Sequence, residues 1–439
     1  MNYQTGQVVY VTVGDVANGG WCVARPESGP VVFVRHALPG ERVLARVTEV
    51  TSRLIRAEAV EVLAPSPDRV EPPCPHAGPG GCGGCDWQHA TLPAQRALKA
   101  AVIRQQLKRL AGIEREVTVE ALPGDEGQAD GRTAGLGWRT RVQFAVRADG
   151  VAGLHAHRSH EVIDVGTCLI AHPVITGLSL TGHRWPGMAS VEALAGTASG
   201  ESAVIVSPGR TARTPLRSES IEGITADSVL RRAGPSLAHL RGRGYLSQRA
   251  AGRDWRVSAG AFWQVHPGAA DALAEAVLAA LEPKHGDAAL DLYCGAGLFA
   301  GILAPAVGPG GAVIGVESDA AAVRDARHNL RDWPWAQVRR GGVAEVLRRG
   351  GLPPARLAVA DPPRAGLARE VIEYVSAPEH GVGRLAYVSC DPATLARDIG
   401  LLAARGWALD GLRAFDAFPM THHVECVATL LANGRTPGI

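Results

Sequence analysis

The sequence predicts an α/β protein of three parts, of which the last contains a doubly wound parallel sheet. Three observations carry this prediction. Residues 1–62 hold short β-branched runs separated by turns, as in "QVVYVTV" and "WCVAR". Residues 63–255 mix strand-like runs with a stretch rich in Pro, Gly and Cys, which predicts a mixed α+β region. From residue 256 to residue 439, strand-like and helix-like segments alternate, a pattern typical of a parallel sheet covered by helices.

Composition limits the classes of protein to which this chain can belong. The formal net charge over 439 residues is only +2, so a basic surface for a nucleic acid would have to be local. The N-terminus has no charged region followed by an apolar block, and no run approaches the roughly 18 apolar residues that span a bilayer. We therefore expect a cytoplasmic protein without a membrane segment. There, the eight cysteines are expected to be metal ligands, catalytic groups or core thiols rather than disulfides.

The first part is predicted to be a small closed β-barrel. Its five short strands, separated by turns such as "GDVANGG" and "LPGE", have the spacing of OB-type barrels, many of which bind RNA. A barrel that acts only as a spacer fits the same pattern. Six arginines against six acidic residues do not separate these alternatives.

The second part opens with the cysteine-rich stretch "PPCPHAGPGGCGGCDWQHA", in which Cys74, Cys82 and Cys85 follow a C-x7-C-x2-C spacing. Its Pro and Gly content predicts no regular structure, so something other than an apolar core must order it. An amphipathic helix is expected from Thr91, with Gly112 as its end signal. Its apolar stripe consists of Leu98, Val102, Ile103, Leu107 and Leu110.

A strand hairpin is expected within "WRTRVQFAVRADGVAGLHAHRSHEVIDV". Residues 139–160 carry four arginines and three histidines against one aspartate. Two interpretations stand equally: a solvated hairpin face, or a track for RNA phosphates. The track would be lined by Arg139, Arg141, Arg158 and His160.

A strand, a glycine turn and a helix are expected in "AALDLYCGAGLFA", where Gly295 and Gly297 let a nucleotide-like ligand approach the backbone closely. The next strand ends on Glu317, about 20 residues after the loop. A carboxylate at that offset can bind both ribose hydroxyls of an adenosine. The combination favours a nucleoside cofactor and looks like S-adenosylmethionine binding, although an ordinary turn with a surface acid fits it too.

Three further side chains carry the chemistry. Asp361 in "DPPRAGL" follows the fourth predicted strand of the sheet, and Cys390 in "YVSCDPATLARD" follows the fifth. Open α/β sheets bind ligands at that edge, and a thiol beside a helix N-terminus can have its pKa lowered. Glu425 interrupts the apolar run of "THHVECVATL", where a carboxylate without a role or partner is costly. A cysteine nucleophile with a carboxylate base suits addition to an electron-poor ring.

The chain resembles the RNA uracil-C5 methyltransferases, which make 5-methyluridine in ribosomal or transfer RNA. The resemblance lies in four motifs and their order: the glycine loop, "DPPRAGL", "YVSCDPATLARD" and "FPMTHHVE". The likeness covers nearly the whole chain, and it implies a Rossmann-like, S-adenosylmethionine-dependent domain at residues 256–439. Cys390 would attack uracil C6, and Glu425 would remove the C5 proton. The resemblance implies four cofactor contacts, from Gln264 in "FWQVHP", Tyr293, Glu317 and Asp361.

The same resemblance assigns the rest of the chain. Residues 1–62 are similar to the TRAM barrel, and the helix at 91–117 is expected to pack on the catalytic domain. Related ribosomal enzymes hold a 4Fe–4S cluster with four cysteines at matching places, although Cys-only ligation also fits a structural zinc. The implied ligands are Cys74, Cys82, Cys85 and Cys168. The remaining thiols, Cys22, Cys294 and Cys426, are expected in the core or near the site.

The expected partner is an RNA, with 23S ribosomal RNA favoured by the barrel and the cysteines and transfer RNA as the alternative. Two other classes stay open. An amine methyltransferase would not need Cys390, because only carbon methylation requires a thiol to convert uracil C5 into a nucleophile. A non-catalytic RNA-binding or assembly factor would need neither Cys390 nor Glu425. We expect a monomer, although no sequence feature bears on oligomeric state.

Overall fold

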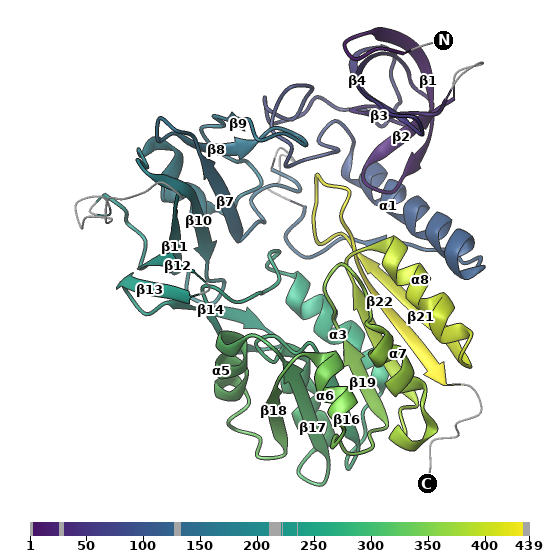
Figure 1. The fold of residues 1–439 in the computed structure, drawn as a ribbon, viewed down its shortest axis with the longest axis vertical. Helices are drawn as coiled ribbons and strands as arrows, with labels where there is room; N and C mark the ends of the chain where they lie inside the picture. Colours follow the sequence, from purple (N-terminus) through teal and green to yellow (C-terminus); the bar gives the residue numbers. More distant parts are fainter. Residues whose placement is uncertain are drawn as a thin grey trace.

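The computed structural model describes residues 3–25, 30–126, 133–209, 221, 223–234 and 236–432. Figure 1 shows three parts: a barrel at the upper right, a seven-stranded sheet at the left and an eight-stranded sheet at the bottom. Among the helices of these residues, none combines the length and apolar composition needed to cross a bilayer.

The barrel is closed, in the strand order β1-β2-β3-β5-β4. Exposed and buried residues alternate along β4, so one face of the strand fills the interior with small apolar side chains such as Val43, Ala45 and Val47. The predicted five-stranded barrel is confirmed. Its strands are β1 (Val8–Ala17), β2 (Trp21–Ala24), β3 (Val32–Arg35), β4 (Arg42–Val50) and β5 (Ile55–Ala64).

Helix α1 (Leu92–Gln106) follows the cysteine-rich stretch and continues as a π-helical turn, η1 (Leu107–Ala111). Thr91 caps its N-terminus, and Gly112 ends it in the left-handed conformation. The helix buries two faces instead of one stripe. Leu98 and Val102 pack into the barrel core, whereas Ile103 and Leu107 pack into the core of the last domain. Leu110 is 41% exposed, so it does not belong to the buried stripe.

The central domain is built on the sheet β13-β12-β11-β10-β7-β8-β9. The predicted hairpin is present as the antiparallel pair β7–β8. A short helix, α2 (Pro173–Gly177), and a 3-10 turn, η2 (Leu180–Gly182), follow β9, and the pair β14 (Tyr245–Ala250) and β15 (Arg253–Ser258) leads into the last domain. The sheet strands are β7 (Arg141–Val146), β8 (Ala152–His155), β9 (Val162–Ile163), β10 (Met188–Ala195), β11 (Ser202–Pro208), β12 (Ser228–Ala233) and β13 (Ser236–Arg241).

The last domain is a doubly wound sheet in the order β18-β17-β16-β19-β20-β22-β21-β6. Its first five strands are parallel, and β22 pairs antiparallel with both β20 and β21. The edge strand β6 (Val119–Glu120) comes from the stretch that follows η1 and pairs with β21. The other strands are β16 (Ala288–Leu292), β17 (Ala312–Glu317), β18 (Ala336–Arg340), β19 (Leu357–Ala360), β20 (Arg384–Ser389), β21 (Trp407–Phe415) and β22 (Glu425–Ala432).

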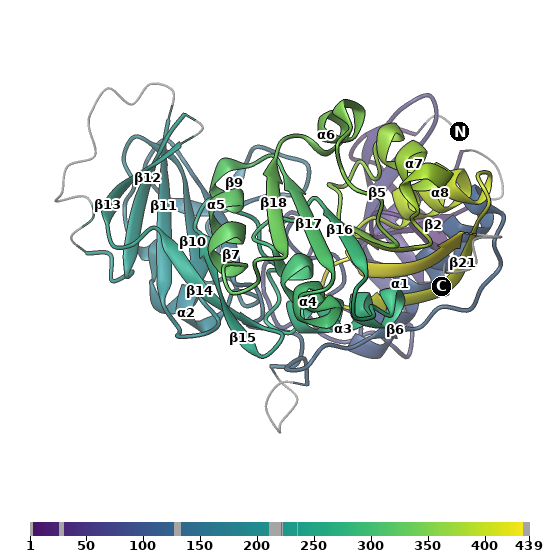
Figure 2. The same ribbon diagram turned by 90° about the horizontal axis from the view of Figure 1, so that it is seen from below.

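Helices cover both faces of this sheet, as Figure 2 shows with α3 and α4 below it and α6, α7 and α8 above it. Two apolar cores result, one on each face. This confirms the predicted α/β fold class with its Rossmann-like domain, because alternating strands and helices must bury both sheet faces. The helices are α3 (Ala269–Leu281), α4 (Leu298–Val307), α5 (Ala320–Asn329), α6 (Val343–Arg349), α7 (Arg369–Ser376) and α8 (Pro392–Ala403), with a 3-10 turn η4 (Pro378–His380).

Candidate active site

A cavity of about 530 Å³ opens at the carboxyl ends of β16, β17, β19 and β20. This volume suits a ligand of nucleoside size, since small-molecule sites typically measure roughly 300–1,000 Å³. The sequence-predicted catalytic and cofactor residues all line it, so the fold brings together side chains from six separate segments. They are Gln264, Tyr293, Glu317, Asp361, Cys390 and Glu425.

The glycine loop between β16 and α4 exposes backbone to this cavity. Tyr293 has a φ of 70° and Gly295 a φ of 53°, and a Cβ built at Gly295 would meet no atom within 4 Å. The loop therefore leaves open space beside its backbone, where a ligand can approach closely. Asp291, fully buried at the end of β16, accepts a hydrogen bond from the Ala300 amide at 2.7 Å, and its burial raises its pKa to about 8. Asp291 thus ties β16 to α4 across the loop.

Glu317 ends β17 and faces the cavity, but its carboxylate already has backbone partners. One oxygen accepts from the Gly295 amide at 3.1 Å. The other accepts from the amides of Ser318 and Asp319, at 2.6 and 2.7 Å. The carboxylate therefore fixes the glycine loop relative to β17 while it lines the cavity.

Cys390 lies between the end of β20 and Asp391, the N-cap of α8. The expectation of a lowered thiol pKa is wrong for the free protein. Burial and then the Glu425 carboxylate raise the pKa of Cys390 to about 11, and the Arg364 guanidinium opposes them only partly. The helix N-terminus does not compensate, because the Asp391 side chain accepts from the Thr394 amide at 2.8 Å and brings its own negative charge. The free protein therefore holds Cys390 as a thiol.

Glu425 is the first residue of β22 and is 5% exposed. Burial and then the nearby Asp361 carboxylate raise its pKa well above the usual value, and Arg364 again opposes them. Burial raises the pKa of Asp361 to about 7. Two carboxyl groups with raised pKa values therefore share the cavity with the thiol, an arrangement that suits proton transfer.

Among the side chains of this cavity that sequence reasoning missed are Arg364, Phe418 and His423. The Arg364 Nη2 lies 3.4 Å from the His423 Nε2, and the ring of Phe418 stands edge-on to that of His423 at 5.8 Å. Burial, followed by the charges of His422 and Arg364, lowers the pKa of His423 to about 3, so the imidazole is neutral. The signal was present: Arg364 and His423 lie inside the motifs "DPPRAGL" and "THHVE".

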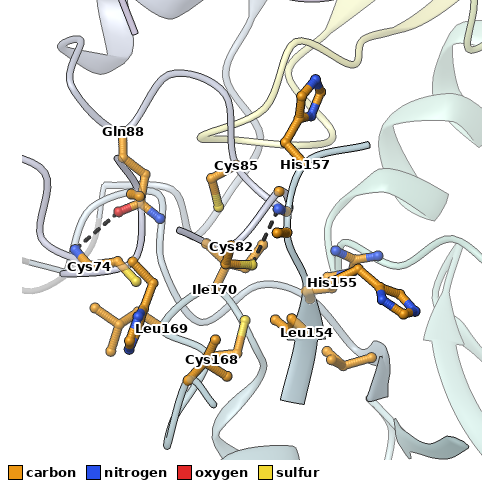
Figure 3. Close-up of a pocket in the computed structure, with 18 of the residues that line it drawn as sticks. Cys74, Cys82, Cys85, Gln88, Leu154, His155, His157, Cys168, Leu169 and Ile170 are labelled. Atoms are coloured by element: carbon orange, nitrogen blue, oxygen red, sulfur yellow. Dashed lines mark hydrogen bonds between the residues drawn. The ribbon is translucent and has the colours of Figure 1, made fainter. Parts of the chain in front are cut away.

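A second cavity, of about 290 Å³, lies where the cysteine-rich stretch meets the central sheet (Figure 3). All four predicted cysteine ligands line it, and none forms a disulfide. Burial and neighbouring thiols raise the pKa of Cys82, Cys85 and Cys168. Within the described residues, however, no group of three or more His, Cys, Asp or Glu side chains is arranged so that it could hold a metal ion. Cys74, the fourth predicted ligand, lines the same cavity.

The basic residues of the central hairpin are mostly engaged within the protein. Arg141 forms an ion pair with Glu192 at 2.6 Å and donates to the Ala261 carbonyl at 2.7 Å. Arg139 donates to the Arg141 carbonyl and lines the thiol cavity. Arg158 is about half exposed and lies 3.5 Å from Glu49 of the barrel. The geometry therefore assigns Arg141 a structural role rather than a place on a phosphate track.

Comparison with known proteins decides the family. Residues 356–433 match the family described as tRNA (Uracil-5-)-methyltransferase, residues 3–60 match the TRAM domain, and residues 268–340 match the Protein-L-isoaspartate(D-aspartate) O-methyltransferase family. A Streptomyces avermitilis protein described as an uncharacterized RNA methyltransferase is 51% identical over 97% of this chain and 98% of its own. The chain belongs to the RNA uracil-C5 methyltransferase family. It is an S-adenosylmethionine-dependent RNA methyltransferase.

Further relatives agree with this methyltransferase assignment. A Bifidobacterium longum protein, also described as an uncharacterized RNA methyltransferase, is 35% identical over 95% of each chain. Among solved structures, the Pyrococcus abyssi tRNA (uracil-54, C5)-methyltransferase in complex with S-adenosyl-L-homocysteine superposes with a TM-score of 0.71. It covers 96% of this chain and 100% of its own at 22% identity, so this likeness concerns the fold.

Proposed function

We propose that this methyltransferase forms 5-methyluridine in RNA, with Cys390 as the nucleophile and Glu425 as the base. The observation that supports it most is that a thiol, two carboxyl groups of raised pKa and the glycine loop line one cavity. An amine methyltransferase has no use for the thiol, since an amine nitrogen is itself a nucleophile. A non-catalytic RNA-binding factor has no use for buried carboxyl groups that face a ligand cavity.

The cofactor residues fit S-adenosylmethionine, which supplies an electrophilic methyl group. Glu317 would bind the ribose hydroxyls, and Tyr293, the glycine loop, Asp361 and Gln264 line the same cavity. The cavity volume and the open space beside Gly295 support this assignment. Binding there would place the methyl donor and Cys390 in one enclosure, because both segments end at the same sheet edge.

The two catalytic side chains, Cys390 and Glu425, act at different steps of the proposed reaction. Cys390 loses its proton to solvent, its sulfur bonds to uracil C6, and the C5–C6 electron pair moves onto the C4 carbonyl as an enolate. C5 of this enolate would then take the methyl group of S-adenosylmethionine, whose sulfonium–methyl bond breaks to leave S-adenosylhomocysteine. Glu425 accepts the C5 proton, the C5–C6 double bond re-forms, and the bond from C6 to Cys390 breaks to return the thiolate. Covalent addition is required because uracil C5 is otherwise a poor nucleophile.

Ribosomal RNA is the substrate that we propose, because the barrel and the thiol-lined cavity occur in the same chain, as in the ribosomal enzymes that it resembles. Transfer RNA is the alternative. It is favoured by the description of the matched family and by the Pyrococcus abyssi enzyme, whose substrate is transfer RNA.

We also propose that the four cavity thiols hold a 4Fe–4S cluster, with structural zinc as the alternative. A zinc ion needs its sulfur ligands converging at about 2.3 Å. What supports a shared group is that all four thiols line one cavity of about 290 Å³. Iron, sulfide and zinc analysis of protein purified without oxygen, with visible absorption before and after reduction, distinguishes cluster, zinc and bare thiols.

The test of the reaction is nucleoside mass spectrometry of ribosomal and transfer RNA from a strain that lacks the enzyme. Each RNA class is incubated with S-adenosylmethionine and either the purified protein or its Cys390→Ala variant. New 5-methyluridine in one class, absent with the variant, supports the proposal and identifies the substrate class. Its absence from both classes, or its formation by Cys390→Ala, refutes the mechanism.

A further inference from the structure

The loop between β21 and β22, residues 416–424, reaches the catalytic cavity but receives its shape from distant parts of the chain. In Figure 1 this yellow loop extends from the sheet toward the barrel. It contains neither helix nor strand, and the hydrogen bonds found within it join only Phe418, Thr421 and His423. Met420 within it has a φ of 68°, a conformation that non-glycine residues adopt at a cost. Contacts from outside must therefore hold the loop in place.

Asp86, which directly follows Cys85, supplies the main polar contact to this loop. One oxygen of its carboxylate accepts from the His422 amide at 3.1 Å and lies 2.6 Å from the His422 Nδ1. The other oxygen accepts from Arg35 of the barrel at 3.1 Å, and Arg35 and Asp86 are only 3% and 8% exposed. A single buried carboxylate therefore joins the barrel, the cysteine-rich stretch and the 416–424 loop.

Backbone contacts reinforce the same junction. The amides of Asp86 and Trp87 both donate to the Met420 carbonyl, at 2.9 and 3.0 Å. The Gln95 side chain of α1 accepts from the Met420 amide at 2.8 Å. At Gly20 of the barrel, an added Cβ would lie 3.0 Å from the His422 Cβ and 3.2 Å from the Asp86 Cβ, so a side chain there would crowd both residues. The loop is thus enclosed from three sides.

The far end of this junction is the catalytic cavity. The rings of His422 and His423 lie 4.1 Å apart, and His423 contacts Arg364 at 3.4 Å. His423 and Arg364 line the cavity together with Cys390 and Glu425. A shift of His422 would therefore move the side chain that holds Arg364, the cation facing the thiol.

We propose that Asp86 is a positioning residue for methyl transfer: through His422 it holds His423 and Arg364 at the wall of the catalytic cavity. The inference rests on the proposed function, since it adds to the catalytic site a residue that acts through its neighbours. It also means that the segment carrying Cys85 and the loop leading to Glu425 would move together, although they lie over 300 residues apart in the sequence.

The experiment compares Asp86→Ala with Glu41→Gln, a control at another buried carboxylate of the barrel junction. Glu41 is likewise a buried carboxylate that joins the barrel to the segment before the cysteines, through Arg69, but it does not contact the 416–424 loop. Two readouts are taken at a temperature at which circular dichroism shows every variant folded. Hydrogen–deuterium exchange follows peptides of residues 416–424 without any RNA, and steady-state kinetics separate kcat from the KM for RNA.

We expect Asp86→Ala to raise exchange in the loop and to lower kcat by about tenfold or more, with KM for RNA within about threefold, because geometry and not binding is lost. Glu41→Gln should leave loop exchange unchanged and kcat within about twofold. The variant Asp86→Ala/His422→Ala should be no slower than the slower single variant, since both substitutions break one contact. If Asp86→Ala does not fold, Asp86→Asn, which keeps an acceptor for the His422 amide, should show a smaller loss of kcat.

Unchanged loop exchange in Asp86→Ala, or raised exchange with unchanged kcat, overturns the inference. An equal loss of kcat in Glu41→Gln also overturns it, because the effect would then follow barrel stability. If the unmodified protein methylates neither RNA class, the proposed function fails, and the exchange measurement alone decides whether Asp86 holds the loop.

Discussion

The reactivity of Cys390 in the free enzyme follows directly from the charges around it. Its pKa is raised to about 11 from an ordinary 9.0, chiefly by burial and then by Glu425. At pH 8 about one Cys390 in a thousand is therefore a thiolate, against roughly one in ten for an ordinary cysteine. Because the thiolate is the reactive form, Cys390 should react with iodoacetamide about a hundredfold more slowly, and about tenfold faster for each unit of pH between 7 and 10.

Two substitutions should move this rate in opposite directions. Glu425→Gln removes a negative charge that disfavours the thiolate, so the pKa of Cys390 falls and alkylation accelerates wherever Glu425 would be ionised. Arg364→Gln removes the positive charge that favours the thiolate, so the pKa rises and alkylation slows. Burial is the largest cause, and neither variant should bring the pKa down to 9.0.

The assay is peptide-resolved mass spectrometry of protein alkylated over a pH series, with glutathione in the same tube as the ordinary thiol. The reasoning is refuted if Cys390 is labelled as fast as glutathione at pH 8, or if both substitutions shift its rate in the same direction. Confirmation would mean that the free enzyme holds Cys390 mainly as a thiol, which protects it from oxidation and alkylation.

Three further predictions concern the framework of the site. Lys99→Met should lower the free energy of unfolding by about 3–5 kcal/mol in a denaturant titration, since the buried Asp416 carboxylate loses its ion-pair partner; the added change Asp416→Asn should restore part of it, and no restoration would contradict the ion-pair explanation. Glu317→Gln should weaken S-adenosylmethionine binding by about tenfold or more in calorimetry, whereas the exposed Asp410→Asn should not. Gly366→Ala, whose Cβ would lie 2.4 Å from the Asp398 Oδ2, should lower Tm more than Gly350→Ala, which is strained only by its φ of 72°.

Local patterns predicted the fold where neighbouring residues determine it. Alternating burial along β4 and the strand–helix alternation after residue 256 depend on spacing within a few residues, and both were visible in the sequence. The pairing of β6 with β21 was not, because Val119 meets Ala414 across almost three hundred residues. The two buried faces of α1 were missed for the same reason: its partners lie in different domains.

The residues of the candidate site likewise fall into those that the sequence predicted and those that only the three-dimensional fold shows. Motif order pointed to Asp361, Cys390 and Glu425, and the fold places all three around one cavity. The direction of the Cys390 pKa was predicted wrongly, because it depends on burial and on a carboxylate that approaches only in three dimensions. The contact between Asp86 and His422 has no sequence signal at all, since neither residue belongs to a spacing rule that relates them.

The most direct test of the proposed mechanism uses RNA that carries 5-fluorouridine in place of uridine. After Cys390 adds to C6 and C5 takes the methyl group, fluorine stands where Glu425 would find a proton, so elimination stops at the covalent stage. With S-adenosylmethionine present, we predict a protein–RNA complex stable to denaturing electrophoresis, with the methylated nucleotide mapped to Cys390 by mass spectrometry and no complex from Cys390→Ala. A complex that survives Cys390→Ala, or one attached at another residue, would contradict the mechanism.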